Sequence, residues 1–287
     1  MFTALVNFLH YAGLTIAVGA VTVRYLLMTR SGLAVSERAP ALRDAAKYGL
    51  VGVAAVLVAA PLRAVVQAQG LAFPGDPLLP LVRSVVMNSD VGRALQLQAI
   101  WGAAAVMAFS VARFGRQRGW SAAAIATFIL ALGPALLGHA AAAVPTLPAQ
   151  VAAVVHALAA GAWIGTLFHL WRIARKASDA TLRALLVAFH PIALGAAALV
   201  AFSGTSLAWQ IVGPLSNLWM TWWGRFLLAK LAVLAGVAAL GYKNWKGSEA
   251  QVASGDRAAL RERMKQELWL ALAVLAITGA LTTTGIE

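Results

Sequence analysis

The chain has 287 residues, of which 61% are hydrophobic and only 11% are charged. Soluble domains carry about 25% charged residues, so this chain lacks the polar side chains that cover a soluble protein. It has no cysteine, which excludes disulfides and thiolate metal sites, and its net charge of +13 lies in short segments between apolar runs, which argues against a nucleic-acid-binding protein.

Apolar runs long enough to cross a membrane as helices, for which about 20 residues are needed, recur along the whole chain. In lipid the backbone must satisfy its own hydrogen bonds, and the runs are too long for the strands of a barrel. The sequence therefore predicts an all-α polytopic membrane protein in contact with the lipid bilayer. In chain order the eight predicted spans are Ala4–Met28, Ala46–Gln69, Val91–Phe114, Trp120–Ala140, Gln150–Ile173, Ala184–Val212, Trp223–Trp245 and Gln266–Thr284.

The distribution of Lys and Arg predicts the orientation. The connections after the first, third, fifth and seventh spans, with the span ends beside them, hold 18 of the 23 basic residues. Basic connections favour the cytoplasmic side, so both termini are predicted to be periplasmic, in a bacterial inner membrane. The longest outer connection, Gly70–Asp90, contains three prolines and is predicted to lie across the membrane surface.

Similar residues recur in the same order in the two parts of the chain, which indicates a tandem repeat of two four-helix halves, 1–145 and 146–287. Four spans per half is an even number, so the halves would share one orientation and be related by a pseudo-twofold axis along the membrane normal. The aligned pairs include His10 with His156, Arg43 with Arg183 and Arg93 with Arg225, at offsets of 146, 140 and 132 residues.

Three histidines, His10, His139 and His156, are predicted to lie at one depth on the outer side. Imidazole suits copper and zinc, and polar groups inside a bilayer are functional candidates. The alternative is that each ring bonds a backbone carbonyl or lies among the headgroups. Met87 and Met220 lie on the same side, where their thioethers would suit Cu(I) or would only fill apolar space.

Two further histidines are predicted to lie away from the outer site. His169 follows His156 by thirteen residues, near the cytoplasmic end of the fifth span, and an interfacial role is expected. His190 precedes Pro191, which leaves a backbone carbonyl without its donor. His190 is expected to satisfy this loosened backbone or, alternatively, to act as an inner relay on a transport path.

Three basic residues near the outer ends of spans are further candidates for the transport path. Arg93 and Arg225 are expected to extend to the headgroups, whereas Lys230 lies deeper. None of the ten acidic residues is predicted to lie deep in a span, so only histidine is expected to relay protons. No nucleotide-binding loop is found, and no enzymatic activity is expected.

Two motifs in the second half carry a resemblance to a known family. Residues 156–165 read His-x4-Gly-x-Trp-x-Gly, and residues 224–231 read Gly-Arg-x4-Lys-Leu. With Gly138–Ala141, the region of Asn244 and the last span, they make residues 135–284 similar to the copper resistance D (CopD) family. Of possible functional residues, His139, His156 and the Gly-Arg-Lys positions match the family pattern.

The resemblance implies an eight-helix inner-membrane protein that moves copper from periplasm to cytoplasm, often with a separate periplasmic CopC-like carrier. The leading hypothesis is copper transport, with the ion bound by His10, His139 and His156 and by Met87 or Met220. One alternative is a redox protein in which His10 and His156 are the axial ligands of haem b. The other is a membrane anchor or sensor for a periplasmic copper carrier.

Overall fold

The computed structural model describes residues 1–29, 31–137, 146–253 and 257–284, and these residues form helices joined by turns and short connections, without strands. Eight helices are long and apolar enough to cross a membrane, which confirms an all-α polytopic membrane protein. The crossing helices are α1 (Phe2–Thr29), α2 (Val35–Leu71), α4 (Asp90–Arg113), α5 (Gln117–Leu130) with α6 (Gly133–Leu137), α8 (Thr146–Ala160) with η1 (Gly161–Gly165) and α9 (Thr166–Ile173), α10 (Asp179–Val212), α12 (Trp222–Ala253) and α13 (Arg257–Leu281).

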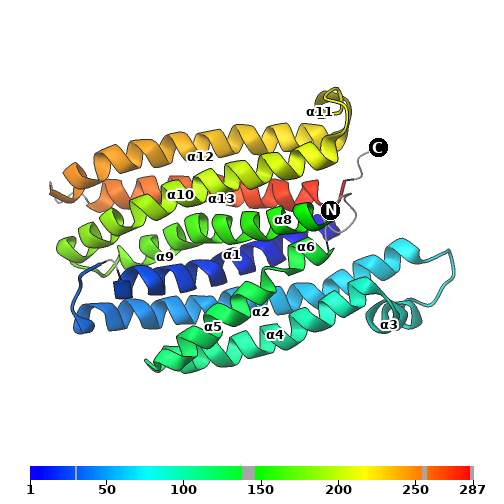
Figure 1. The fold of residues 1–287 in the computed structure, drawn as a ribbon, viewed down its shortest axis with the longest axis horizontal. Helices are drawn as coiled ribbons and strands as arrows, with labels where there is room; N and C mark the ends of the chain where they lie inside the picture. Colours follow the sequence, from blue (N-terminus) through cyan, green and yellow to red (C-terminus); the bar gives the residue numbers. More distant parts are fainter. Residues whose placement is uncertain (30, 138–145, 254–256, 285–287) are drawn as a thin grey trace.

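The long helices lie side by side in one bundle (Figure 1). Helix α1 is central, because it packs against α2 and α5 of its own half and against α8, η1, α9, α10 and α13. Two short helices, α3 (Leu78–Asn88) and α11 (Asn217–Met220), lie at the end where α1 begins, which we call the α3 end. The opposite end, with the connections that follow α1, α4, α9 and α12, is called the basic end.

Several helices are longer than the predicted spans. Helix α2 begins at Val35, α12 continues to Ala253 and α13 begins at Arg257. The added turns hold most of the charged residues of the basic end, which low hydropathy had assigned to connections. Arg, Lys, Glu and Ala are good helix formers, so these polar segments continue the helices beyond the apolar core.

The fourth predicted span, Trp120–Ala140, is interrupted rather than continuous. Helix α5 ends at Leu130, and α6 begins at Gly133, directly before Pro134. Pro134 has no N–H to donate to the carbonyl one turn back, which agrees with the end of α5 at Leu130. The amphipathic helix α3, with only Val85 buried, lies within the connection that was predicted to cover the membrane surface.

The two halves meet backbone to backbone where α1 crosses η1, a π-helical turn. A Cβ atom on Gly165 would lie 2.0 Å from the carbonyl oxygen of Thr15, and one on Gly19 would lie 2.2 Å from the carbonyl carbon of Gly165. Small residues at such crossings let helices in lipid approach closely and pack well. No sequence signal had predicted the π turn, a type that occurs often at functional sites.

Candidate functional site

His10 is fully buried, with an exposed fraction of 0%, and neither ring nitrogen has a hydrogen-bond partner among the residues that the structure describes. The guanidinium of Arg63, from α2, lies close enough for its charge to act on this ring. Arg63 Nε donates to Asn7 Oδ1 at 3.0 Å, and Asn7 Nδ2 donates to Thr282 Oγ1 at 2.9 Å. This polar cluster links α2, α1 and α13 near the α3 end and leaves an imidazole unsatisfied inside the bundle.

His156, the second candidate ligand, projects from α8 toward α10. Its Nδ1 lies 3.1 Å from Ser203 Oγ, and the Ser203 hydroxyl donates its hydrogen to the carbonyl oxygen of Leu199. Because a hydroxyl has one hydrogen, Ser203 Oγ accepts from His156 Nδ1–H, and Nε2 keeps its lone pair. The ammonium of Lys230, from α12, acts electrostatically on the ring. His156 therefore presents a ligand nitrogen.

The neighbours of the two histidines occupy corresponding positions in the proposed repeat. At the offset of 140 residues found for the second span, Arg63 aligns with Ser203. Each of these residues is the α2 or α10 neighbour of the histidine in its own half. The first half thus has an arginine and the second half a serine at the aligned position beside its histidine.

The crossing of α1 with η1 relates the two histidines in space. Gly19 and Gly165 are each nine residues beyond the histidine of their half, and they touch each other. Nine residues of helix span about 13 Å. His10 and His156 therefore lie at similar distances from the contact between the halves, both toward the α3 end.

The predicted metal site of three histidines stays a prediction. Among the described residues, no group of three His, Asp or Glu side chains is arranged to hold a metal ion. His139 lies outside the described residues. Met87 on α3 and Met220 on α11 are 64% and 71% exposed, so each offers its sulfur at the surface of the α3 end rather than inside the bundle.

The turns that lead into α4 and α12 are built alike. Ser89 Oγ accepts from the backbone N–H of Gly92, and Thr221 Oγ1 accepts from that of Gly224, both at 3.0 Å. Neither glycine has room for a Cβ atom, because each packs on the backbone of the preceding short helix. This geometry fixes α3 and α11, with their methionines, against the first turns of α4 and α12.

Arg93 and Arg225 are exposed at the α3 end, as the sequence predicted. Arg93 pairs with Asp90, and Arg225 donates to the carbonyl oxygen of Trp219 at 2.9 Å. The Arg225 guanidinium also lies over the ring of Trp222, with 5.2 Å between its carbon and the ring centroid. Both side chains hold local structure at the surface and do not enter the bundle.

The predicted interfacial position of His169 is wrong. Its side chain is 1% exposed, and Nε2 donates to the carbonyl oxygen of Ile16 at 3.1 Å, half-way along α1. The π turn places an additional residue before α9 and changes the direction in which His169 points. His190 packs edge-to-face on Trp245, with 6.1 Å between ring centroids, and so links α10 to α12 near the basic end.

The sequence did not predict that an acidic side chain is buried inside the bundle. Glu267 is 5% exposed, ten residues into α13, and its Oε2 accepts from Asn244 Nδ2 at 3.0 Å. The error follows from the late predicted start of the last span, which had placed Glu267 at its end. An intramembrane carboxyl is a functional candidate.

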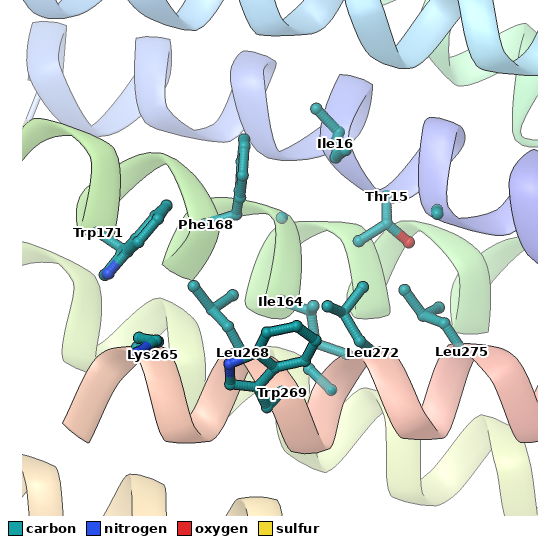
Figure 2. A pocket seen from close by; sticks show the side chains of 13 residues that line it. Thr15, Ile16, Ile164, Phe168, Trp171, Lys265, Leu268, Trp269, Leu272 and Leu275 are labelled. Carbon is teal, nitrogen blue, oxygen red and sulfur yellow. The ribbon is translucent and has the colours of Figure 1, made fainter. Parts of the chain in front are cut away.

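An apolar groove of about 250 Å³ lies between α1, α9 and α13 (Figure 2). Thr15, Phe168 and Leu272 line it, and Lys265 and Trp171 stand toward the basic end. The groove offers no histidine, methionine or carboxylate, so it does not serve as a metal site. It borders the π turn through Ile164 and Gly165.

Comparison with known families gives two matches. Residues 183–281 match the family model described as copper resistance protein D, and residues 1–145 match the model described as copper resistance protein D-like, N-terminal domain. Together they include α1 to α6, nearly all of α10, and all of α11, α12 and α13. No curated protein and no solved structure matched the chain.

Proposed function

The chain belongs to the copper resistance protein D family, and from this premise we propose that it carries copper ions across the bacterial inner membrane, from periplasm to cytoplasm. The basic end would face the cytoplasm, as Lys- and Arg-rich connections do. Copper would enter at the α3 end, delivered free or by a CopC-like carrier, and meet the exposed sulfurs of Met87 and Met220. The protein would transport its substrate without a catalytic reaction.

The observation that carries this proposal is His10, whose ring is buried in the bundle with both nitrogens unpaired. Buried polar groups in native proteins normally have partners, so an imidazole without a protein partner is a candidate ligand for an ion. Neutral imidazole is a good ligand for copper. His156 would supply Nε2 from the other half, and His139 would complete the set.

The positive charges of Arg63 and Lys230, one near each histidine, support a site of passage rather than of storage. A bound copper ion would be repelled by the neighbouring cation, which lowers its affinity. Transport needs binding that is strong enough to admit the ion and weak enough to release it. A site for permanent copper would instead place carboxylates or further soft ligands there.

Copper binding by purified variants tests the proposal. His156→Ala and His139→Ala should each weaken copper binding at least tenfold, a loss of about 1.4 kcal/mol. His169→Ala is the matched control, because this ring bonds backbone and should leave copper affinity unchanged. Uptake of copper by proteoliposomes should fall in parallel. Equal losses in all three variants would contradict a site at the α3 end.

Haem b is a second candidate, favoured by the arginine beside a buried unpaired histidine. Arg63 would suit a propionate, and His10 and His156 would be the axial ligands. An absorption spectrum of the purified protein separates the two functions. A Soret band at one haem per chain would replace copper transport by redox chemistry, and copper without a Soret band would support transport.

A further inference from the structure

A buried carboxyl lies between α12 and α13, far from the histidines of the α3 end. Glu267 is 5% exposed, and in the part of the chain that the structure describes its hydrogen bond comes from Asn244 Nδ2, at 3.0 Å. No described basic side chain forms an ion pair with it. Burying a carboxylate without an opposite charge is costly, so this group needs a physical reason to be there.

Glu267 belongs to the face of α13 that packs on α12. A Cβ atom on Gly241 would lie 3.2 Å from Glu267 Oε1, so α12 approaches the carboxyl closely at this glycine. The other face of α13 borders the apolar groove, where Lys265 and Leu272 are seen (Figure 2). Helices α1 and α9 contribute only uncharged side chains to this groove, and Lys265 stands on the face that lines it.

Asn244 connects the carboxyl to a cleft at the basic end. The cleft has a volume of about 560 Å³ and is lined by Asn244 and Gln266 and by three basic residues, Lys243, Lys246 and Arg263. It is open and polar enough to hold water. The amide of Asn244 therefore has the buried carboxyl on one side and a route for water on the other.

The surroundings suit a proton better than a metal ion. The Asn244 amide can donate to an ionised carboxylate and, through its own oxygen, accept from a protonated one, so the pair is hydrogen-bonded in both states. A metal ion would find one carboxyl and one amide, with basic residues around the entrance. From this geometry we infer that Glu267 is a proton-binding group that exchanges its proton with the cleft, and that Asn244 is its positioning residue.

The exchange moves one proton and no electron. A proton from water in the cleft binds a carboxylate oxygen of Glu267, which becomes a neutral acid, and the reverse step returns the proton to water. If the chain moves copper as proposed above, a cation in the bundle would favour the ionised carboxyl. Copper movement would then depend on this proton, and that dependence rests on the proposed function.

Infrared spectroscopy tests the proton site without any transport assay. Protein in bilayers should show a carboxylic-acid C=O band that appears as pH falls, is absent in Glu267→Gln and shifts in Asn244→Leu. Glu262→Gln is the control, because Glu262 lies one turn away, is exposed and pairs with Lys265. The same band in Glu267→Gln, or no such band in the unaltered protein, would overturn the inference.

Copper uptake into proteoliposomes with a pH indicator inside tests the coupling. Uptake by the unaltered protein should change with internal pH, and uptake by Glu267→Gln should not. Copper uptake that still depends on internal pH in Glu267→Gln would contradict the coupling. If the unaltered protein takes up no copper, the proposed function fails, whereas the infrared result still decides whether Glu267 exchanges a proton.

Discussion

The first and second halves hold their α3-end histidines in different ways. His10 is enclosed completely, has no hydrogen bond and lies near Arg63. His156 is only partly buried, is held by Ser203 at the position that corresponds to Arg63, and has its cation on α12 instead. The two histidines lie toward the same end of the bundle, but different side chains contact each ring or act on it electrostatically.

The comparison shows that the same residue type at corresponding positions can have different neighbours, and under our proposal these neighbours would give the two histidines different affinities for copper. Ser203 fixes the tautomer and direction of His156, as partners of metal-binding histidines usually do. His10 has no such partner, so its ring is not fixed by a hydrogen bond. In our proposal His156 is therefore the ligand with a fixed orientation, and His10 is the ligand that can reorient. Each variant below removes one side chain that distinguishes the two histidines, or disrupts the contact that joins the halves.

The largest effect is expected at the contact between the halves. Gly165→Val would place side-chain atoms where a Cβ alone is 2.0 Å from the Thr15 carbonyl oxygen. Overpacking of this severity costs about 3 kcal/mol or more, so the thermal unfolding temperature in detergent should fall strongly. Gly195→Ala is the control, because nothing lies within 4 Å of its Cβ position. Equal unfolding temperatures would show that the crossing does not hold the halves together.

Removing the cation beside His10 should have the next largest effect. Arg63→Gln should raise copper affinity at least tenfold, because a unit charge even about 12 Å away contributes about 1.4 kcal/mol at an effective dielectric constant of about 20. Competition with a copper chelator measures the change. Arg63→Lys keeps the charge and should leave the affinity unchanged. A weaker site in Arg63→Gln would mean that the arginine organises the ligand instead of opposing the ion.

Lys230→Gln gives the second half the residue that the first half has at this position, Gln98. Copper affinity should rise several-fold, and release of copper inside proteoliposomes should become slower. The effect should be smaller than at Arg63, because the partly exposed surroundings of His156 screen charge better. Lys230→Arg is the matched control. Faster release from Lys230→Gln would count against a role of the cation in expelling copper.

The smallest effect is expected when the hydrogen bond to His156 is removed. Ser203→Ala loses an interaction worth about 1 kcal/mol, so copper affinity should fall about fivefold. Ser203→Thr keeps the hydroxyl and should bind copper nearly as the unaltered protein does. Histidine resonances in NMR spectra should show the Nδ1–H tautomer of His156 only when the hydroxyl is present. An unchanged tautomer in Ser203→Ala would remove the basis for this assignment.

The sequence predicted the features that depend on hydrophobicity. It predicted less well the features that depend on where charged helix ends begin and on the register within a helix. Eight apolar runs were enough to predict eight crossing helices. Hydropathy reports burial in lipid, however, so it could not show that α13 begins at Arg257, and Glu267 was misplaced as a result. Nothing in the composition of residues 161–165 distinguishes a π turn from an α-helix, and the inward turn of His169 was missed for that reason.

The π turn also makes the fifth crossing segment one residue longer than a regular helix of the same height would be. Deleting Ala162 would let α8 and α9 join as one α-helix and rotate every later residue by about 100° relative to α8. His169 would then leave the Ile16 carbonyl, and Trp171 would leave the groove, while His156 kept its place beside Ser203. A single-codon deletion could thus change the orientation of the part of this segment that carries His169 and leave the part that carries His156 unchanged.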